Sequence, residues 1–195
     1  MDAQTKVTGV ILAGGLARRM SGQDKGLVDF KGKPLINYAI AAISEIADVT
    51  IINANRNIKQ YQEYGFPVIS DLTGNFDGPL AGILAAMAYA KNGILLIMPC
   101  DMPFVKAQHI KKLLNALVEN DADVAVACDS NRLYPVFLAI NTALLPSLQA
   151  YLGSGYRKVE TWLVQQKLVR VDFNGEAEIF ININSMTELM VMRED

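Results

Sequence analysis

A glycine pair followed by arginines and a lysine is the first group of residues in the chain whose spacing suggests chemistry. The stretch reads VILAGGLARRMSGQDKG, so an apolar run stops at Gly14 and Gly15, and Arg19 and Lys25 follow in a polar loop. Glycines let backbone N–H groups approach phosphate oxygens, and the basic side chains would add positive charge. These residue types favour a polyanionic ligand such as a nucleoside triphosphate, with a structural glycine turn as the alternative.

The glycine loop matches neither of the two common phosphate-binding motifs. A Walker A loop requires GxxxxGK(S/T), which SGQDKG does not supply, and the dinucleotide pattern GxGxxG is also absent. We therefore expect a nucleotide site of another kind, in which residues from elsewhere in the chain supplement the loop.

Two aspartates directly follow apolar stretches that are expected to form strands. Asp101 follows GILLIMPC, and Asp71 follows PVIS. A carboxylate at the end of a buried strand is a common Mg²⁺ ligand in enzymes that handle Mg-nucleotides. Each residue has an ordinary alternative: Asp101 could cap a helix that begins near Pro103, and Asp71 could be a turn residue before LTGN.

Amides and a helical glycine complete the candidates. Asn53 lies at the end of a further predicted strand. Asn182 and Asn184 lie on one face of an extended segment, although Asn184 could instead cap the last helix. Pro79 is ordinary at the start of a helix. Gly82 in the first turn costs about 1 kcal/mol relative to Ala, and a backbone or a flat base approaching closely would explain it.

The remaining reactive residue types point away from other chemistries. His109 is the only histidine and lies at the start of an amphipathic helix, where we expect it to be exposed, so a histidine base is not expected. Cys100 and Cys128 have apolar neighbours and form no C-x-x-C pattern, which predicts buried free thiols and no zinc site. Trp162 is expected in the core.

Strands and helices alternate across most of the chain and would bring the candidates together. Apolar runs predict strands or extended segments at 7–13, 49–55, 67–70, 93–101, 122–128, 134–140, 168–173 and 179–184. Helices are predicted at 34–47, 58–65, 79–90, 107–120, 142–152, 158–166 and 186–194. The alternation indicates an α/β fold with a mainly parallel sheet, in which 93–101 is central and 122–128 and 134–140 form a hairpin.

Ligands of open α/β sheets bind outside the carboxyl ends of the strands. The predicted strand ends carry the glycine pair, Asn53, Asn55, Asp71 and Asp101. If the sheet is parallel, these residues share one rim, so a single site could use them all.

Composition sets the broad class of the protein. The chain has 195 residues, which suits one domain with a less regular part after about residue 131. The net charge of −2 is spread along the chain and indicates no nucleic-acid surface. No apolar stretch approaches the roughly 20 residues that span a bilayer, and the polar start of the chain lacks the features of a signal peptide. We therefore expect a cytoplasmic protein without membrane contact.

Taken in order, the motifs resemble those of the molybdenum cofactor guanylyltransferase family, the MobA-type enzymes. LAGGLARRMSGQDKG is similar to the family signature L-A-G-G-x-(A/S)-x-R-M-G-x-D-K, and NANR, GPLAG, PCDMP and NIN match its later motifs in the same order. The resemblance covers nearly the whole chain. The sequence departs from the usual pattern at Ser21, at Met102 and at Ser185 with Met186, and none of these departures removes a charged group.

The resemblance implies a three-layer α/β/α, Rossmann-like fold of the nucleotide-diphospho-sugar transferase type, with a mostly parallel sheet. It implies that the protein transfers GMP from GTP to molybdenum-molybdopterin, releases pyrophosphate and uses Mg²⁺. In a single domain spanning 1–195, about 1–130 would be the nucleotide-binding half and about 131–195 the acceptor-binding half. Partners would be GTP and a molybdopterin-type acceptor, and could include other proteins of molybdenum cofactor biosynthesis or molybdoenzymes.

The resemblance also implies residue roles. Arg19, Lys25 and Asp101 would be catalytic, and Asp101 would bind the metal. The expected GTP-binding residues are Leu12, Ala13, Gly14, Gly15, Lys25, Asn53, Asp71, Gly78, Pro79, Gly82 and Asp101. Candidates for the acceptor site are Asn182, Asn184 and Arg157, with exposed surface charge as the alternative for Arg157.

The implied acceptor group is a terminal phosphate, which is already anionic at neutral pH and requires no general base. Catalysis would then consist of positioning and charge neutralisation during in-line attack on the α-phosphate of GTP. One alternative is a CTP-dependent molybdopterin or sugar-phosphate nucleotidyltransferase. Another is a nucleotide-binding module without turnover, which would not need both Lys25 and Asp101.

Overall fold

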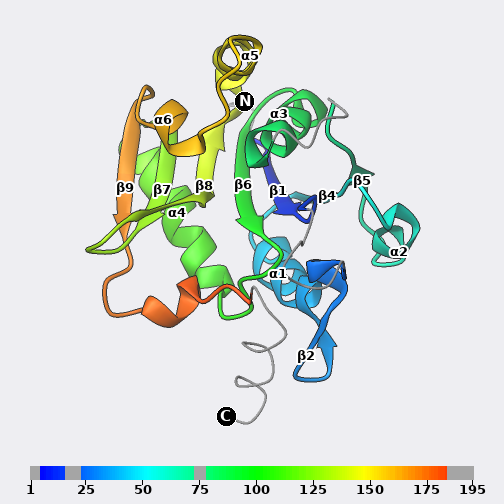
Figure 1. Ribbon diagram of the computed structural model, residues 1–195. Helices are drawn as coiled ribbons and strands as arrows, with labels where there is room; N and C mark the ends of the chain where they lie inside the picture. The colour runs from blue at the N-terminus through cyan, green and yellow to red at the C-terminus, as the bar shows by residue number, and fades with distance from the viewer. Residues whose placement is uncertain (1–4, 16–22, 73–77, 184–195) are drawn as a thin grey trace.

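The computed structural model describes residues 5–15, 23–72 and 78–183, which form a seven-stranded sheet in the order β5-β4-β1-β6-β8-β7-β9 (Figure 1). The strands are β1 (Val7–Leu12), β4 (Val49–Asn53), β5 (Val68–Ile69), β6 (Ile94–Pro99), β7 (Val124–Cys128), β8 (Leu133–Asn141) and β9 (Leu168–Asp172). Among these strands β8 is antiparallel to its neighbours β6 and β7, and the other pairs are parallel. The mostly parallel sheet, the central β6 and the β7–β8 hairpin are therefore confirmed.

Helices connect the strands, as the alternation predicted. They are α1 (Leu35–Ser44), α2 (Ile58–Gln62), α3 (Pro79–Ala90), α4 (Ala107–Glu119), α5 (Leu145–Gly153) and α6 (Val159–Leu163). Three short 3-10 helices, η1 (Lys25–Leu27), η2 (Thr142–Leu144) and η3 (Ala177–Phe180), and a small hairpin of β2 (Asp29–Phe30) and β3 (Lys33–Pro34) complete the described elements. The last predicted helix, 186–194, lies outside the described residues.

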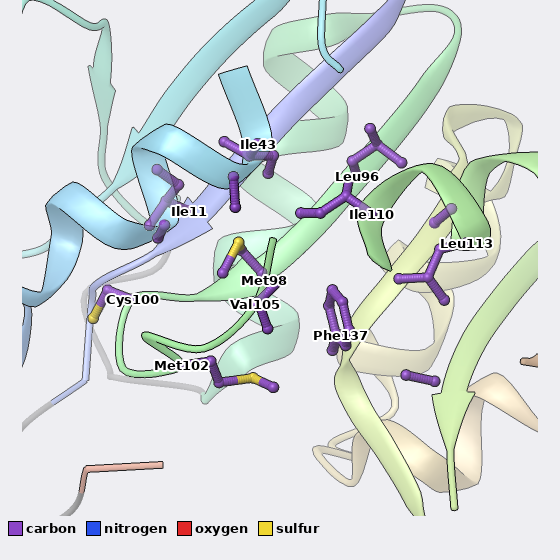
Figure 2. Packing of buried hydrophobic residues seen from close by; sticks show 14 of the residues in the cluster. Ile11, Ile43, Leu96, Met98, Cys100, Met102, Val105, Ile110, Leu113 and Phe137 are labelled. Carbon is purple, nitrogen blue, oxygen red and sulfur yellow. The ribbon is translucent and has the colours of Figure 1, made fainter. Parts of the chain in front are cut away.

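Helices cover both faces of the sheet, so the fold has three layers. On one face, Ile11 of β1 packs with Ile43 of α1 and Ile110 of α4 (Figure 2). On the other face, its neighbour Val10 packs in a core that includes α3, α5 and α6, and Trp162 lies in this core as expected. Burial of both faces explains why β6 is apolar throughout instead of alternating, as is typical of parallel strands.

The prediction of an extended segment at 179–184 was wrong for its first residues. Ile179 and Phe180 belong to η3, and only 181–183 continue beyond it within the described chain. In a strand, consecutive side chains point to opposite faces. Here both Ile179 and Phe180 are buried in the same hydrophobic cluster, which a helical turn allows and a strand does not.

The sheet continues across the position at which the two functional halves were predicted to meet. β6, before residue 130, pairs with β8, after it. The assignment of nucleotide and acceptor to separate halves stays a prediction. None of the helices described here has both the length and the apolar character needed to cross a membrane.

Candidate functional site

A cleft of about 410 Å³ opens at the ends of β1, β4 and β6. Leu12 pairs with Asn53 of β4 and with Pro99 of β6, so the three strands end at the same level. The shared rim expected from the sequence is thus present. Each residue predicted to bind the nucleotide lies in the cleft lining, apart from Gly82. The described lining consists of Leu12, Ala13, Gly14, Gly15, Lys25, Asn53, Asp71, Gly78, Pro79, Pro99, Cys100, Asp101 and Val136.

Lys25 and Asp101, which are far apart in the sequence, form an ion pair in this cleft. The Nζ atom of Lys25 in η1 donates to Oδ2 of Asp101, which follows β6. The other carboxylate oxygen, Oδ1, is buried and has no hydrogen-bond partner among the described residues. The alternative role of Asp101 as a helix cap is wrong, because α4 begins at Ala107 and the side chain at its N-cap position belongs to Lys106.

Asp71 is held by two asparagine amides. Its Oδ1 accepts from the Nδ2 of Asn53 at 2.9 Å, and its Oδ2 accepts from the Nδ2 of Asn55 at 2.8 Å. The backbone N–H of Asp71 donates to Oδ1 of Asn55 at 2.9 Å. The carboxylate is therefore fixed at the cleft wall, and these bonds also set the direction of both amides.

Gly82 lies behind the cleft wall, where Asn53 explains the absence of a side chain. A Cβ atom on Gly82 would overlap Oδ1 of Asn53 and lie 3.0 Å from its Cγ. A similar Cβ on Gly14 would lie 2.9 Å from Nδ2 of Asn55. The described atoms nearest to that position belong to the side chains of Asn53 and Leu12, so a close backbone does not explain Gly82. Approach of a base stays a prediction.

The described candidate acceptor residues do not lie together, in contrast to the predicted nucleotide-binding residues. The backbone N–H of Ile183 donates to the Asp101 carbonyl at 3.2 Å, which places Asn182 in a segment attached to the metal candidate. Arg157 is exposed, donates to the carbonyls of Leu152 and Tyr156, and is not among the described residues of the cleft lining. The alternative interpretation of Arg157, as exposed surface charge, therefore fits the structure better. Arg19 and Asn184 lie outside the described residues.

His109 is buried, so the expectation that it is exposed was wrong. Its side chain closes the first turn of α4, because Nδ1 accepts from the backbone N–H of Lys106 at 2.9 Å. Its Nε2 lies 3.0 Å from a carboxylate oxygen of Glu176. The amphipathic pattern of the helix predicted its apolar face correctly. It did not show that the histidine would cap the start of the helix and be covered by residues 173–176. His109 is not in the described cleft lining.

Both cysteines are buried and unpaired with each other, as predicted. Burial raises the pKa of the Cys100 thiol well above its usual range, and the nearby Asp101 carboxylate acts in the same direction. Cys100 lines the cleft but remains a protonated thiol at neutral pH. In the part of the chain that the structure describes, no cluster of three or more His, Cys, Asp or Glu side chains could hold a metal ion.

Asn55 was expected on the rim with the other strand-end residues but was given no binding role, and it orients Asp71 through two hydrogen bonds. Sequence reasoning missed Val136 and Asp24. Val136 reaches the cleft from β8, where the pairing with β7 shifts register. Asp24, beside Lys25, makes buried contacts with α2. The sequence gives no signal for the last two, because they depend on how distant elements pack.

Comparison with known proteins agrees with the geometry of the cleft. Residues 9–170 match the sequence profile described as the MobA-like NTP transferase domain. The chain belongs to the MobA-like NTP transferase family. The resemblance inferred from the motifs is confirmed, and the residues matched include most of β1, the glycine loop, Asp71 and Asp101.

Relatives within the MobA-like family extend over nearly the entire chain. A molybdenum cofactor guanylyltransferase from Shewanella loihica is 40% identical over 189 residues, covering 97% of this chain and 96% of the relative. Its counterpart from Shewanella putrefaciens is 42% identical over 182 residues and covers 93% of each chain. The crystal structure of molybdopterin-guanine dinucleotide biosynthesis protein A from Archaeoglobus fulgidus has a TM-score of 0.79 and 25% identity, covering 96% of this chain and 97% of that one. The expected nucleotidyltransferase fold is therefore confirmed.

Proposed function

We propose that this protein is a molybdenum cofactor guanylyltransferase, which transfers GMP from GTP to molybdenum-molybdopterin and releases pyrophosphate. The observation that carries the proposal is the Lys25–Asp101 pair in a cleft at the carboxyl ends of the sheet. A cation and a partly unsatisfied carboxylate beside a glycine loop suit a triphosphate and its metal ion. The full-length relatives of that name support the choice of reaction and substrates.

The nucleotide would lie along the cleft. Its phosphates would meet the backbone at Gly14 and Gly15 and the ammonium of Lys25, with Arg19 as a further proposed contact. Its base would lie near Pro79 and the fixed carboxylate of Asp71. A carboxylate accepts hydrogen bonds only, so it suits the adjacent N–H donors on the edge of guanine.

Asp101 fits the proposed Mg²⁺ ion. Its Oδ1 atom is buried without a partner among the described residues, and such an atom needs a hydrogen-bond donor or a cation. Mg²⁺ commonly binds through one or two carboxylates together with substrate phosphates, so a multi-residue cage is not required. When bound, the ion would neutralise charge on phosphate oxygens. Asn182, near the Asp101 backbone, would lie toward the acceptor.

The chain's own residues would catalyse the reaction by holding the substrates in place and by neutralising negative charge. The attacking phosphate of the acceptor is already anionic, and the described cleft lining contains no histidine that could act as a base. Lys25 would offset the charge that develops on the leaving pyrophosphate. Electrostatic contacts of this kind contribute on the order of 10²–10³ in rate each. The fixed carboxylate of Asp71 would hold the nucleotide for in-line attack.

A pyrophosphate-release assay with molybdenum-molybdopterin as acceptor and GTP, CTP or UTP as donor tests the proposal. Release with GTP, dependent on the acceptor and on Mg²⁺, is the expected result. Faster release with CTP would overturn the guanylyl assignment in favour of a cytidylyltransferase. Tight GTP binding without pyrophosphate release would instead favour a nucleotide-binding module. The cytoplasmic location and any protein partners stay predictions.

A further inference from the structure

Asp24, the residue before Lys25, is a buried carboxylate that the proposed chemistry does not use. It is 6% exposed and is not among the described residues that line the cleft. Its Oδ1 accepts from the Tyr61 hydroxyl at 2.5 Å, and its Oδ2 accepts from Nδ2 of Asn57 at 3.0 Å. A buried carboxylate is unfavourable unless it is paired and hydrogen-bonded, so these contacts allow Asp24 to lie here.

Arg56 ties the same loop to the same segment at two further points. Its Nε lies 3.4 Å from Oδ2 of Asp24, and its Nη2 donates to the carbonyl of Gln23 at 3.2 Å. Arg56 and Asn57 directly precede α2, and Tyr61 lies within it. One short stretch of chain therefore holds both the side chain of Asp24 and the backbone beside it.

Gly26 brings the other side of Lys25 against the same helix. A Cβ atom on Gly26 would lie 2.5 Å from the Tyr61 hydroxyl oxygen and 3.3 Å from two carbons of its ring. Tyr61 is fully buried and hydrogen-bonded to Asp24, so it has little room to move aside. Lys25 is thus flanked on both sides by residues whose positions are set by Tyr61.

Lys25 itself reaches the end of β6. Its ammonium meets Asp101, whereas Asp24 and Gly26 face Tyr61. A lysine side chain has many rotamers, so its ammonium is easier to place when the backbone of the residue is already fixed. Neighbouring residues can fix that backbone in advance. The anchor of Asp24, Arg56, Asn57 and Tyr61 supplies that fixed point.

We infer that Asp24 is a positioning residue, which acts through its bonds to the 56–61 segment to aim the Lys25 ammonium at the phosphates. The inference rests on the proposed function, because it gives Lys25 the phosphate contact. Asp24 does not line the described cleft and is not proposed to contact the substrate. Its effect on turnover must therefore pass through Lys25.

The test is a double-mutant cycle of Asp24→Asn and Lys25→Met, with kcat and KM for GTP measured by pyrophosphate release. Asparagine keeps the shape of the side chain at residue 24 but loses the charge. A displacement of about 1 Å can cost about 100-fold in rate, so we expect Asp24→Asn to lower kcat about 10- to 100-fold. In the Lys25→Met background the same substitution should change kcat less than about twofold, because the group through which it acts is gone.

Tyr61→Phe provides a second arm, which removes the hydroxyl bound to Asp24 and retains the buried ring. We expect it to lower kcat less than Asp24→Asn does, and to lose that effect in the Lys25→Met background. Tyr38→Phe is its matched control, since the Tyr38 hydroxyl donates to the Phe30 carbonyl at 2.8 Å in the neighbouring hairpin and not to Asp24. Asp48→Asn, at the amino end of β4, is the control for the change of charge.

The outcomes separate the inference from the function on which it rests. A wild-type protein that releases no pyrophosphate from any nucleotide would overturn the proposed function and the inference with it. An active wild type whose Asp24→Asn and Tyr61→Phe variants keep normal kcat would overturn the inference alone. Losses that multiply in the double variants would also overturn it, since a general structural role acts independently of Lys25. If Asp24→Asn fails to fold, the Tyr61→Phe cycle decides.

Discussion

The side-chain amide of Asn53 occupies the space in which a side chain on residue 82 would have to lie. Gly82 belongs to the first turn of α3, and Asn53 is the last residue of β4. Asn53 is 3% exposed and donates to Asp71, so its position is fixed from the other side. A strand end, a helix start and the carboxylate at the cleft wall are thereby packed into one unit.

Gly82→Ala tests this unit. The new Cβ would overlap Asn53 Oδ1, and displacing a packed side chain typically costs about 1–3 kcal/mol. We expect GTP affinity to fall about tenfold, measured by calorimetric titration, because Asn53 and Asp71 must shift together. The gain in helix propensity of about 1 kcal/mol should partly offset the loss in stability.

Gly153→Ala is the matched control for that substitution. Gly153 is also helical, but beyond its chain neighbours and the backbone of its own helix no described atom lies within 4 Å of the position of its missing Cβ. We expect an increase in stability of about 0.4–1 kcal/mol and unchanged GTP affinity. Unchanged affinity in Gly82→Ala would show that the unit tolerates movement of Asn53.

Asp101→Asn should abolish most turnover. The substitution removes the charge that faces both Lys25 and the proposed metal ion, and it retains the shape of the side chain. We expect kcat to fall about 10²–10³-fold, with a higher Mg²⁺ concentration required for half-maximal rate. Steady-state pyrophosphate release at varied Mg²⁺ measures both. Near wild-type kcat with normal Mg²⁺ dependence would contradict the metal assignment.

His109→Ala should lower stability and leave catalysis unchanged. The imidazole accepts from the N-cap backbone of α4 and lies against Glu176, and loss of a helix cap typically costs about 0.5–2 kcal/mol. Urea unfolding should show the loss, and kcat should stay within about twofold of wild type. The exposed Lys111 on the same helix serves as a control through Lys111→Ala, which should change neither quantity. A large drop in kcat for a folded His109→Ala protein would give this residue a role in turnover.

Alkaline pH should destabilise the folded protein, because a buried thiol and a buried phenol hold their protons more tightly in the folded state. Burial raises the pKa of Cys100 and of Tyr61 in the folded protein, so both groups keep their protons to higher pH when folded than when unfolded. The stability that these two protonated groups contribute to the fold is fully present below the pKa of cysteine in the unfolded chain, near 8.5. It is lost as pH rises above that value. Each such proton gives a slope of about 1.4 kcal/mol per pH unit.

The measurement is the free energy of unfolding by urea between pH 7.5 and 10.5, in the presence of a reductant. We expect little change up to about pH 8 and a steepening decline from about pH 9. Cys100→Ala should reduce the slope between pH 9 and 10, since it removes one of the titrating groups. An equal slope in both proteins would show that Cys100 does not contribute.

Several features could be predicted because they depend on local patterns. The apolar run at 93–101 predicted a central strand, and the periodicity of 107–120 predicted a helix, because burial on two faces or on one stripe leaves a direct trace in the sequence. The rim residues Gly14, Asn53 and Asp101 could be placed together without coordinates, since each follows a strand and parallel strands end at one edge.

Other features depended on which distant side chains meet. No local pattern shows that Gly82 is small because of Asn53, that Asp24 is buried against Tyr61, or that a single histidine caps its own helix under a distant turn. Hydrogen bonds and close packing between segments depend on the relative placement of whole elements, and short sequence windows carry no record of it. The sequence alone therefore determined the family, the layered fold and the residues of the rim. Only the tertiary structure decided how those residues are held, because that depends on contacts between segments tens of residues apart.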